Sequence, residues 1–483
     1  MTLVVLAACI LGIAGLFFLD HDKASRNSTA LWLPVAWIWI LGSRVPSMWL
    51  GLAPTTGSVQ VLDATLEGNS TDALVFGTLE AAGIMVLLHR RRQTGALLRS
   101  SVPILIYFTY CIASVLWSPF PDVALKRWFK AVGDLVMALV IVTDPEPIAA
   151  LRRLYSRVGF ILLPASIFLI RYSVLGRGFN PDGSPENIGV TTHKNSLGLI
   201  TFVIALGAVW NLHGLLRLRD QACRRHQLYG RRLLAQGALL ASGVAVLRMA
   251  QSATAITCFT LGSGLMIGTG LRAVRRSATR TNAFLLSIAA AVGIGTIFDL
   301  DEVVMHMLGR STNLTGRTEI WKTVIPLARD PIIGAGFESF WNSISQTLHH
   351  LANPYMFSNL NSAHNGYLEV YLNLGLVGVS LVGLILVSGY CRAASALCRN
   401  SEVGGLILAS IITTAVYSIT EAGFKPLSPT WIFLLLAVVF GGGISSGCIK
   451  LEAPVRQARY WGPDDEPSPW ESSAPTVDWT GVK

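Results

Sequence analysis

Two residues suited to group transfer occur in one mostly polar stretch of this chain, residues 300–365, which lies between two apolar runs. Arg317 lies two residues after Thr315, which can cap a helix, and the free N–H groups of a helix start attract anions. His364 precedes an apolar run, and a neutral imidazole can take a proton from a hydroxyl. The pattern indicates a phosphate-binding cation and a general base, although a solvated Arg317 paired with Glu319 or a lipid headgroup is the alternative interpretation.

A second polar segment contains further candidate cations. Thr192 is expected to cap the next helix, which places His193, Lys194 and Asn195 at its N-terminus, where an anion is favoured. Lys194 is therefore a second candidate for phosphate binding, with simple extension to the membrane interface as the alternative. Arg248, in the next short polar loop, is either a third candidate or an interfacial anchor.

Other polar residues are candidates for supporting roles. Asn365 adjoins His364, and Glu369 lies one turn further into the apolar run. Carboxylates inside membrane spans are usually functional or paired, and this applies equally to Asp134 and Glu421. For Asp134 we expect pairing with Ser, Thr, Asn or Arg from a neighbouring helix.

A glycine-rich segment with aromatic residues occupies the middle of the polar stretch. Gly334 and Gly336 predict a tight turn there. Phe337, Phe340 and Trp341 follow and are expected to form an interfacial or sugar-stacking surface.

Membrane helices must position these residues. A chain with 52% hydrophobic and 14% charged residues and a mean hydropathy of +0.52 is too apolar for a soluble globular protein. The apolar runs are continuous and not alternating, so they indicate an all-α polytopic protein and exclude a closed barrel. We expect about 13 transmembrane helices, within a range of about 12 to 14. The expected spans are 2–19, 31–52, 72–88, 101–117, 129–143, 157–171, 195–213, 233–249, 255–271, 283–299, 366–390, 403–420 and 430–447.

Orientation follows from the distribution of arginine. Arginines gather in alternate loops, and the positive-inside rule places those loops in the cytoplasm of a bacterial inner membrane protein. The N-terminus and the large polar loop are then periplasmic and the C-terminus is cytoplasmic. Because the net charge of +10 is spread over separate loop ends, the sequence argues against nucleic-acid binding. The basic loops are those around 90–99, 152–157, 217–232, 272–280 and 392–399.

The expected organisation has four parts. Residues 1–299 form transmembrane helices one to ten, 300–365 the periplasmic loop with amphipathic helices, 366–447 the last three helices, and 448–483 a disordered cytoplasmic tail. No cysteine falls in a periplasmic loop, so no disulfide is expected. No Cys/His group has zinc-ligand spacing, so no metal site is expected either.

Four motifs in this order resemble one known superfamily. They are Thr-His-Lys-Asn-Ser-Leu-Gly at 192–198, Leu-Thr-Gly-Arg-Thr-Glu-Ile-Trp at 314–321, the Gly-x-Gly-x-x-x-Phe-Trp of 334–341, and His-Asn-Gly-Tyr-Leu-Glu-Val-Tyr-Leu-Asn-Leu-Gly at 364–375. The combination resembles the O-antigen ligase and Wzy-type polysaccharide polymerase superfamily, particularly its exopolysaccharide polymerase branch. The resemblance covers roughly residues 100 to 447.

The resemblance implies a membrane glycosyltransferase of GT-C-like architecture that uses no metal and no cofactor. Its donor and acceptor are glycans linked to undecaprenyl diphosphate in the lipid bilayer, and a flippase and a chain-length regulator are implied partner proteins. Arg317 is the implied diphosphate clamp, with Lys194 or Arg248 as a second cation. His364 is the implied general base for an inverting transfer that polymerises repeat units.

Three alternatives remain. An O-antigen ligase would pass the glycan to a lipid A core. A transporter or flippase for lipid-linked sugars would share the span count, and a non-catalytic scaffold would tolerate loss of His364. Members of the superfamily often carry Arg or Lys at the position of Ala253, and this departure weakens the ligase assignment more than the polymerase assignment.

Overall fold

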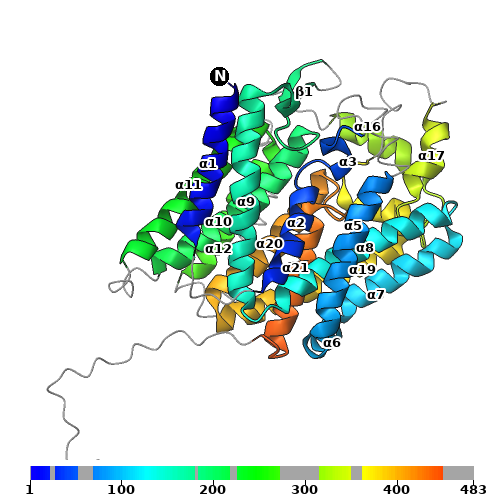
Figure 1. The fold of residues 1–483 in the computed structure, drawn as a ribbon. Coiled ribbons are helices and arrows are strands. Elements are labelled where there is room, and N and C mark those ends of the chain that lie inside the picture. Colours follow the sequence, from blue (N-terminus) through cyan, green and yellow to red (C-terminus); the bar gives the residue numbers. More distant parts are fainter. Residues whose placement is uncertain are drawn as a thin grey trace, which may run out of the picture. The chain divides into compact units, whose positions relative to one another are not determined.

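The computed structural model describes residues 2–21, 28–52, 69–179, 183–217, 226–271, 315–349 and 362–449. These residues form a helical bundle with one short antiparallel sheet (Figure 1). The sheet pairs β1 (Arg177–Phe179) with β2 (Pro185–Asn187). The α-helices are α1 (Thr2–Asp20), α2 (Trp32–Leu41), α3 (Pro46–Trp49), α5 (Ser70–His89), α6 (Arg91–Ser100), α7 (Val102–Ala113), α8 (Pro121–Val142), α9 (Pro147–Tyr172), α10 (Lys194–Arg217), α11 (His226–Ala250), α12 (Ala253–Gly270), α16 (Thr315–Val324), α17 (Phe340–His349), α19 (Gly366–Arg399), α20 (Ser401–Thr420) and α21 (Pro429–Ser445).

Apart from 31–52, each expected span that falls on described residues contains one long helix, and the span 283–299 lies outside them. Seven helices are long and apolar enough to cross a membrane, and an eighth is reached if α6 and α7, bent by 88°, count as one span. The expected single span at 31–52 is wrong, because Gly42 ends α2 and Pro46 begins the separate short helix α3. The seven are α5, α9, α10, α11 with its limits at Tyr229–Ala250, α12, α19 and α20.

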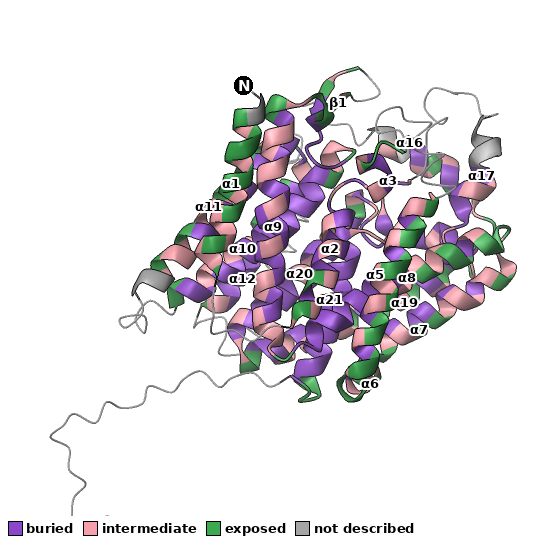
Figure 2. Cartoon of the chain, viewed as in Figure 1, coloured by how far each residue is buried: buried purple, intermediate pink, exposed green. Residues whose placement is uncertain are grey.

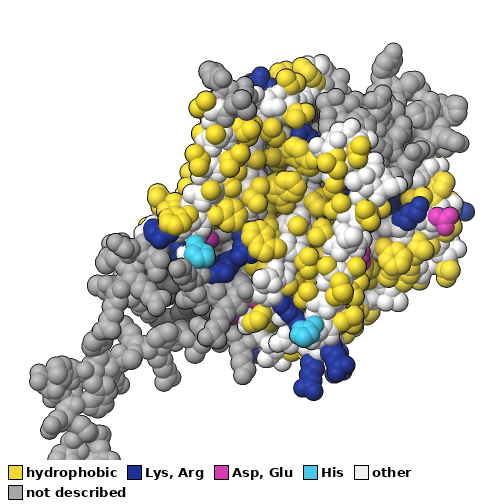
Figure 3. All heavy atoms as spheres, in the orientation of Figure 1, with side chains coloured by type: hydrophobic (Ala, Val, Ile, Leu, Met, Phe, Trp, Pro, Cys, Tyr) yellow, Lys and Arg dark blue, Asp and Glu magenta, His cyan; other side chains and the backbone are white. Residues whose placement is uncertain are grey.

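Helices α10, α20 and α21 form the centre of the bundle. Nearly every residue of α21 is buried, and Figure 2 shows the same burial along most of α10 and α20. Outer helices such as α5 and α19 leave apolar side chains exposed, among them Leu74, Met85 and Val387. Hydrophobic side chains cover much of the face seen in Figure 3. An exposed apolar surface of this kind fits a lipid environment.

Arginines from the expected basic loops lie together at one end of the bundle. Arg152 pairs with Glu402 at the start of α20, and Arg217 donates to Ser401 Oγ over 3.2 Å. Arg399 donates to the carbonyl of Ile444 over 2.8 Å. These contacts join the start of α20 to the start of α9 and to the end of α10, as the alternation of spans predicts. The loop 272–280 lies outside the described residues.

A small hydrophobic cluster forms beside the start of α19 and brings together α16, α17 and the turn between them. Its buried members include Ile320, Val324, Trp341 and Ala363. The prediction of amphipathic helices in the polar loop is therefore confirmed for α16 and α17. Helix α16 begins at Thr315 and ends at Val324, just before Pro326, as the sequence indicates.

The turn at 330–337 is fastened to a break in α19. Gly375 has φ 63°, which interrupts the helix, and a Cβ built there would lie 2.2 Å from the carbonyl oxygen of Ile332. Gly336, also with a positive φ, donates to the carbonyl of Asn373 over 2.8 Å. The glycine-rich turn is thus a docking surface for the start of α19, since a side chain at Gly375 would prevent this close approach.

Asp134 is paired, as expected, but its partners differ from the expected Ser, Thr, Asn or Arg side chains. Asp134 is fully buried in α8 and accepts from the indole of Trp37 over 2.8 Å and from the backbone N–H of Leu427 over 2.9 Å. No Ser, Thr, Asn or Arg side chain bonds to it among the described residues. Because Leu427 belongs to the loop after α20, Asp134 fixes the segment that follows Glu421.

Candidate functional site

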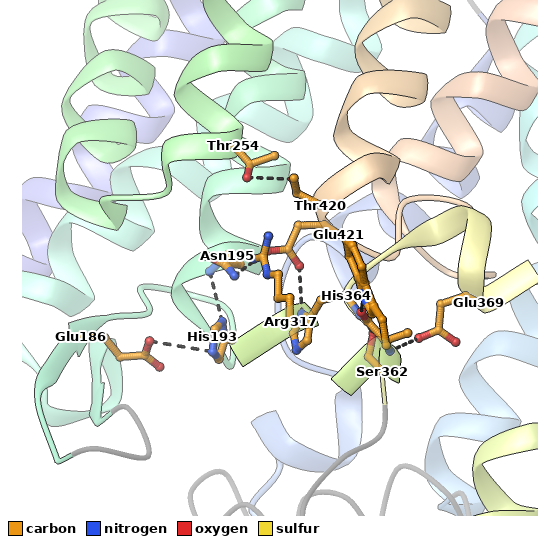
Figure 4. Close-up of polar contacts among 12 residues, drawn as sticks. Glu186, His193, Asn195, Thr254, Arg317, Ser362, His364, Glu369, Thr420 and Glu421 are labelled. Atoms are coloured by element: carbon orange, nitrogen blue, oxygen red, sulfur yellow. Dashed lines mark hydrogen bonds and ion pairs between the residues drawn. The ribbon is translucent and has the colours of Figure 1, made fainter. Parts of the chain in front are cut away.

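Glu421 is the centre of the polar cluster at the end of α20 (Figure 4). One carboxylate oxygen accepts from Arg317 Nη2 over 2.8 Å and from Asn195 Nδ2 over 2.8 Å. The other oxygen lies 3.2 Å from His364 Nδ1. The structure therefore brings together residues from the polar loop, the start of α10 and the start of α19, which lie far apart in the sequence.

The carboxylate of the cluster is nearly buried, whereas its cation and its imidazole are partly exposed. The side chain of Glu421 is 10% exposed, whereas those of Arg317 and His364 are 23% and 39% exposed. In the described part of the chain Arg317 makes one ion pair, through Nη2, which leaves other guanidinium N–H groups to meet a ligand. A buried carboxylate thus holds a cation and an imidazole that both remain accessible.

The contact with Glu421 determines the tautomer of His364. An ionised carboxylate only accepts hydrogen bonds, so Nδ1 carries the hydrogen and donates it to Glu421 Oε2. The lone pair of the neutral ring is then on Nε2. This arrangement, a carboxylate that orients a histidine, is the one that general-base catalysis requires.

His364 lies at a fixed point before α19. Its backbone has φ 48°, a left-handed conformation that is uncommon for residues other than glycine and is adopted more often by asparagine, aspartate and histidine than by the others. Asn365 caps α19 by accepting from the backbone N–H groups of Tyr367 and Leu368, both over 3.0 Å. Gly366 donates to the carbonyl of Glu421 over 3.0 Å, which joins the two helix ends directly. The role of Asn365 in this structure is therefore to cap α19 with its side-chain oxygen.

His193 caps α10, and the expectation that Thr192 does so is wrong. His193 Nδ1 accepts from the backbone N–H of Asn195 over 3.2 Å, so this ring is neutral with its hydrogen on Nε2, 4.0 Å from Glu186. The pKa of His193 is lowered, because the effect of burial exceeds the opposing effect of the Glu186 and Glu421 carboxylates. Because its Nδ1 is engaged by the cap, His193 supports the position of Asn195.

The candidate second cations differ in their relation to the cluster. Lys194 begins α10 and directly precedes Asn195, whose side chain donates to Glu421. Arg248 is exposed in the last turn of α11, and no contact joins it to Glu421 among the described residues. The geometry thus favours Lys194 over Arg248.

The position of Ala253 is close to the cluster. Ala253 begins α12, and the hydroxyl of its neighbour Thr254 lies 3.0 Å from that of Thr420, the residue before Glu421. A basic side chain at this position would therefore start near the carboxylate. Here the position carries no charge.

Glu369 is buried and holds the segment before His364. Its two oxygens accept from the backbone N–H of Ala363 over 2.6 Å and from the indole of Trp341 over 2.8 Å. The expected aromatic surface is wrong, because Phe337, Phe340 and Trp341 are at most 6% exposed. They pack inside the protein, since the turn at Gly336 directs the chain inward against α19.

Metal ligands are not grouped in the described residues. No cluster of three or more His, Cys, Asp or Glu side chains there could hold a metal ion. The charged pair at the centre of the cluster is Arg317 and Glu421, with the imidazole of His364 beside it. The arrangement suits an anion that binds beside a proton-accepting imidazole.

Comparison with known proteins adds an independent observation. The profile of the O-antigen ligase family matches residues 237–383, a segment that contains Arg317 and His364. The resemblance to the O-antigen ligase superfamily is thereby confirmed. The chain is also 25% identical over 316 residues to the exopolysaccharide production protein ExoQ of Rhizobium meliloti (strain 1021), which covers 63% of this chain and 68% of that protein. This similarity agrees with the exopolysaccharide branch of the superfamily. The protein is accordingly a multi-pass bacterial membrane protein in which residues 237–383 are similar to the O-antigen ligase family.

Sequence reasoning missed the central role of Glu421. It lies outside the segment that the O-antigen ligase profile matches, and the sequence indicated only that this carboxylate is functional or paired, without naming a role or partners. Its position at the last turn of a span, directly before a Gly-containing loop, was the available signal. The identity of its partners depends on three helices that meet only in the fold.

Proposed function

We propose that the protein is a glycosyltransferase that polymerises undecaprenyl-diphosphate-linked repeat units on the periplasmic side of the inner membrane. The observation that carries the proposal is that Arg317 and His364 both bind one carboxylate, that of Glu421. This cluster lies at the end of the bundle opposite the ion pair of Arg152 and Glu402. The family profile and the resemblance to an exopolysaccharide production protein support the same class of reaction.

In the proposed reaction an acceptor hydroxyl attacks the anomeric carbon on the face opposite the diphosphate. The new C–O bond forms as the bond from the anomeric carbon to the phosphate oxygen breaks, and the electron pair leaves with the diphosphate. Arg317, with Lys194 as the second cation, stabilises the charge of the leaving group. Nε2 of His364 accepts the hydroxyl proton, while Nδ1–H remains bonded to Glu421. The transfer inverts the anomeric configuration and needs no metal.

The test is a reaction of purified full-length protein in nanodiscs with single-repeat lipid-linked intermediates extracted from a strain that lacks the gene. We expect a ladder of lipid-linked oligomers, formed equally well with EDTA present. Unextended intermediates after long incubation with folded protein would contradict the proposal. Products that form only when a lipid A core acceptor is added would instead identify a ligase, the function that Ala253 makes less favourable.

Glu421 provides a prediction about this mechanism. In Glu421→Gln the amide has one oxygen, so its NH₂ group faces either Arg317 or His364. Next to His364 it favours the tautomer with the lone pair on Nδ1 and the hydrogen on Nε2, where the base must accept a proton. We expect turnover in the nanodisc reaction to fall about 10- to 100-fold, the usual effect of removing such an orienting group.

The matched control is Glu402→Gln. Glu402 also pairs with an arginine, Arg152, but it does so at the opposite end of the bundle. We expect this variant to keep the wild-type turnover per folded molecule. Equal losses in both variants would mean that Glu421 acts only through stability.

A further inference from the structure

Helix α16 contacts the site at two points one turn apart. Arg317 Nη2 donates to Glu421 over 2.8 Å, and Trp321 Nε1 donates to the carbonyl of Ala363, also over 2.8 Å. Residues separated by four positions share one face of a helix. One face of α16 therefore holds both the proposed diphosphate clamp and the residue directly before His364.

Ala363 is held from two sides. Its carbonyl accepts from Trp321, and its N–H donates to Glu369 Oε1 over 2.6 Å. The residue is completely buried in the cluster that joins α16 and α17 to α19. The other oxygen of Glu369 is occupied by Trp341. Both polar groups of the Ala363 backbone are thus fixed in direction by side chains.

Ala363, held by these two hydrogen bonds, directly precedes a residue with a strained backbone, His364. A left-handed backbone at a residue other than glycine, such as His364, is strained and persists only where the surroundings determine it. On the far side, Asn365 is fixed as the cap of α19. On the near side, the backbone N–H of His364 donates to Ser362 Oγ over 3.1 Å, and Ala363 is held by Trp321. Of the three residues named here, Ser362 and Asn365 adjoin the start of α19 in the sequence, whereas Trp321 belongs to α16.

We infer that Trp321 is a positioning residue for the proposed reaction, on which this inference rests. Through the carbonyl of Ala363 it holds His364 in its left-handed conformation and fixes the general base relative to Arg317 on the same helix. The diphosphate and the acceptor hydroxyl belong to two different lipid-linked molecules. The distance between Arg317, which binds the diphosphate, and His364, which binds the hydroxyl, must therefore be kept constant by the protein. A displacement of about 1 Å can reduce a rate by about 10²-fold.

Two substitutions separate the hydrogen bond of Trp321 from its packing. Trp321→Phe retains an aromatic ring and removes the N–H. Trp321→His retains an N–H at the same position of a five-membered ring and removes the larger part of the apolar surface. We expect kcat to fall about tenfold or more in Trp321→Phe, with the KM for the lipid-linked donor within about twofold of wild type. We expect Trp321→His to keep most of kcat at a pH where its imidazole is neutral, despite lower thermal stability.

The matched control is Trp128→Phe. Trp128 Nε1 donates to the carbonyl of Phe108 over 3.0 Å, a partly buried indole contact of the same kind between α8 and α7. We expect no change in kcat for this variant. A second readout is hydrogen–deuterium exchange of the 362–368 peptide in the full-length protein in nanodiscs, which we expect to be faster in Trp321→Phe and unchanged in Trp128→Phe.

The outcomes distinguish this inference from the proposed function. If Arg317→Ala and His364→Gln lose activity while Trp321→Phe keeps wild-type kcat and wild-type exchange, the inference is overturned and the function stands. A loss of kcat in Trp321→His with retention in Trp321→Phe assigns Trp321 to packing and also overturns it. Wild-type activity in Arg317→Ala and His364→Gln would remove the proposed function itself.

Discussion

Replacing Arg317 with alanine should reduce oligomer formation by about 10²- to 10³-fold, the effect of removing one group that stabilises developing negative charge. Arg317 is the accessible cation bonded to Glu421, and a diphosphate leaving group requires countercharge more than it requires a proton. The measurement is the rate of lipid-linked oligomer formation in nanodiscs at varied donor concentration. Arg317→Lys keeps the charge but not the planar arrangement of donors, so we expect a smaller loss.

Arg329 provides the control for Arg317. It is an exposed cation on the same loop, beyond the end of α16. If Arg317 acts at a specific position, Arg329→Ala keeps the wild-type rate. A comparable loss in both variants would indicate that the loop contributes only a general positive field.

Replacing His364 with glutamine should lower kcat by about 10²- to 10⁴-fold, the range for removal of a general base. Glutamine can still donate to Glu421, so the cluster can remain bonded while the proton acceptor is lost. We expect the donor KM to change little. The measurement is kcat of wild type and variant in the nanodisc reaction at saturating donor concentration.

His213 is the corresponding control, since it lies in α10 near Gly270, at the end of the bundle opposite the site. His213→Gln should have the wild-type kcat. If His364→Gln itself retained the wild-type kcat, His364 would not be the base, and another residue would have to supply that role.

The sequence was sufficient to predict most of the helices that the structure describes and to propose Arg317 and His364 as site residues. Long apolar runs determine the spans, and Pro326 limits the end of α16 because proline acts locally. The roles of Arg317 and His364 could be proposed because an arginine in the first turn of a helix and a histidine before a span are both local patterns. Their proximity to each other is visible only in the fold.

Two features depended on tertiary structure and could not be predicted. Glu421 acquires its partners because α10, α16 and α19 start beside the end of α20, and no local pattern states which helix ends meet. The aromatic residues at 337–341 have the composition of a binding surface, but the docking of Gly336 on α19 places them in the interior. Burial of such residues is determined by neighbours distant in sequence.

Helix α19 has more residues than are needed to cross a membrane, and its 34 residues form two helical parts that meet at Gly375. From Gly375 to Arg399 the second part extends over about 37 Å at 1.5 Å per residue, which is enough to cross a hydrocarbon region of about 30 Å. In the proposed function, the turns before Gly375, with His364 at their start, stand at the level of the phosphate headgroups. A sugar carried on a polyprenyl chain can reach this level while its tail stays dissolved in the bilayer, so both substrates can arrive by lateral diffusion and the growing chain can leave into the aqueous space.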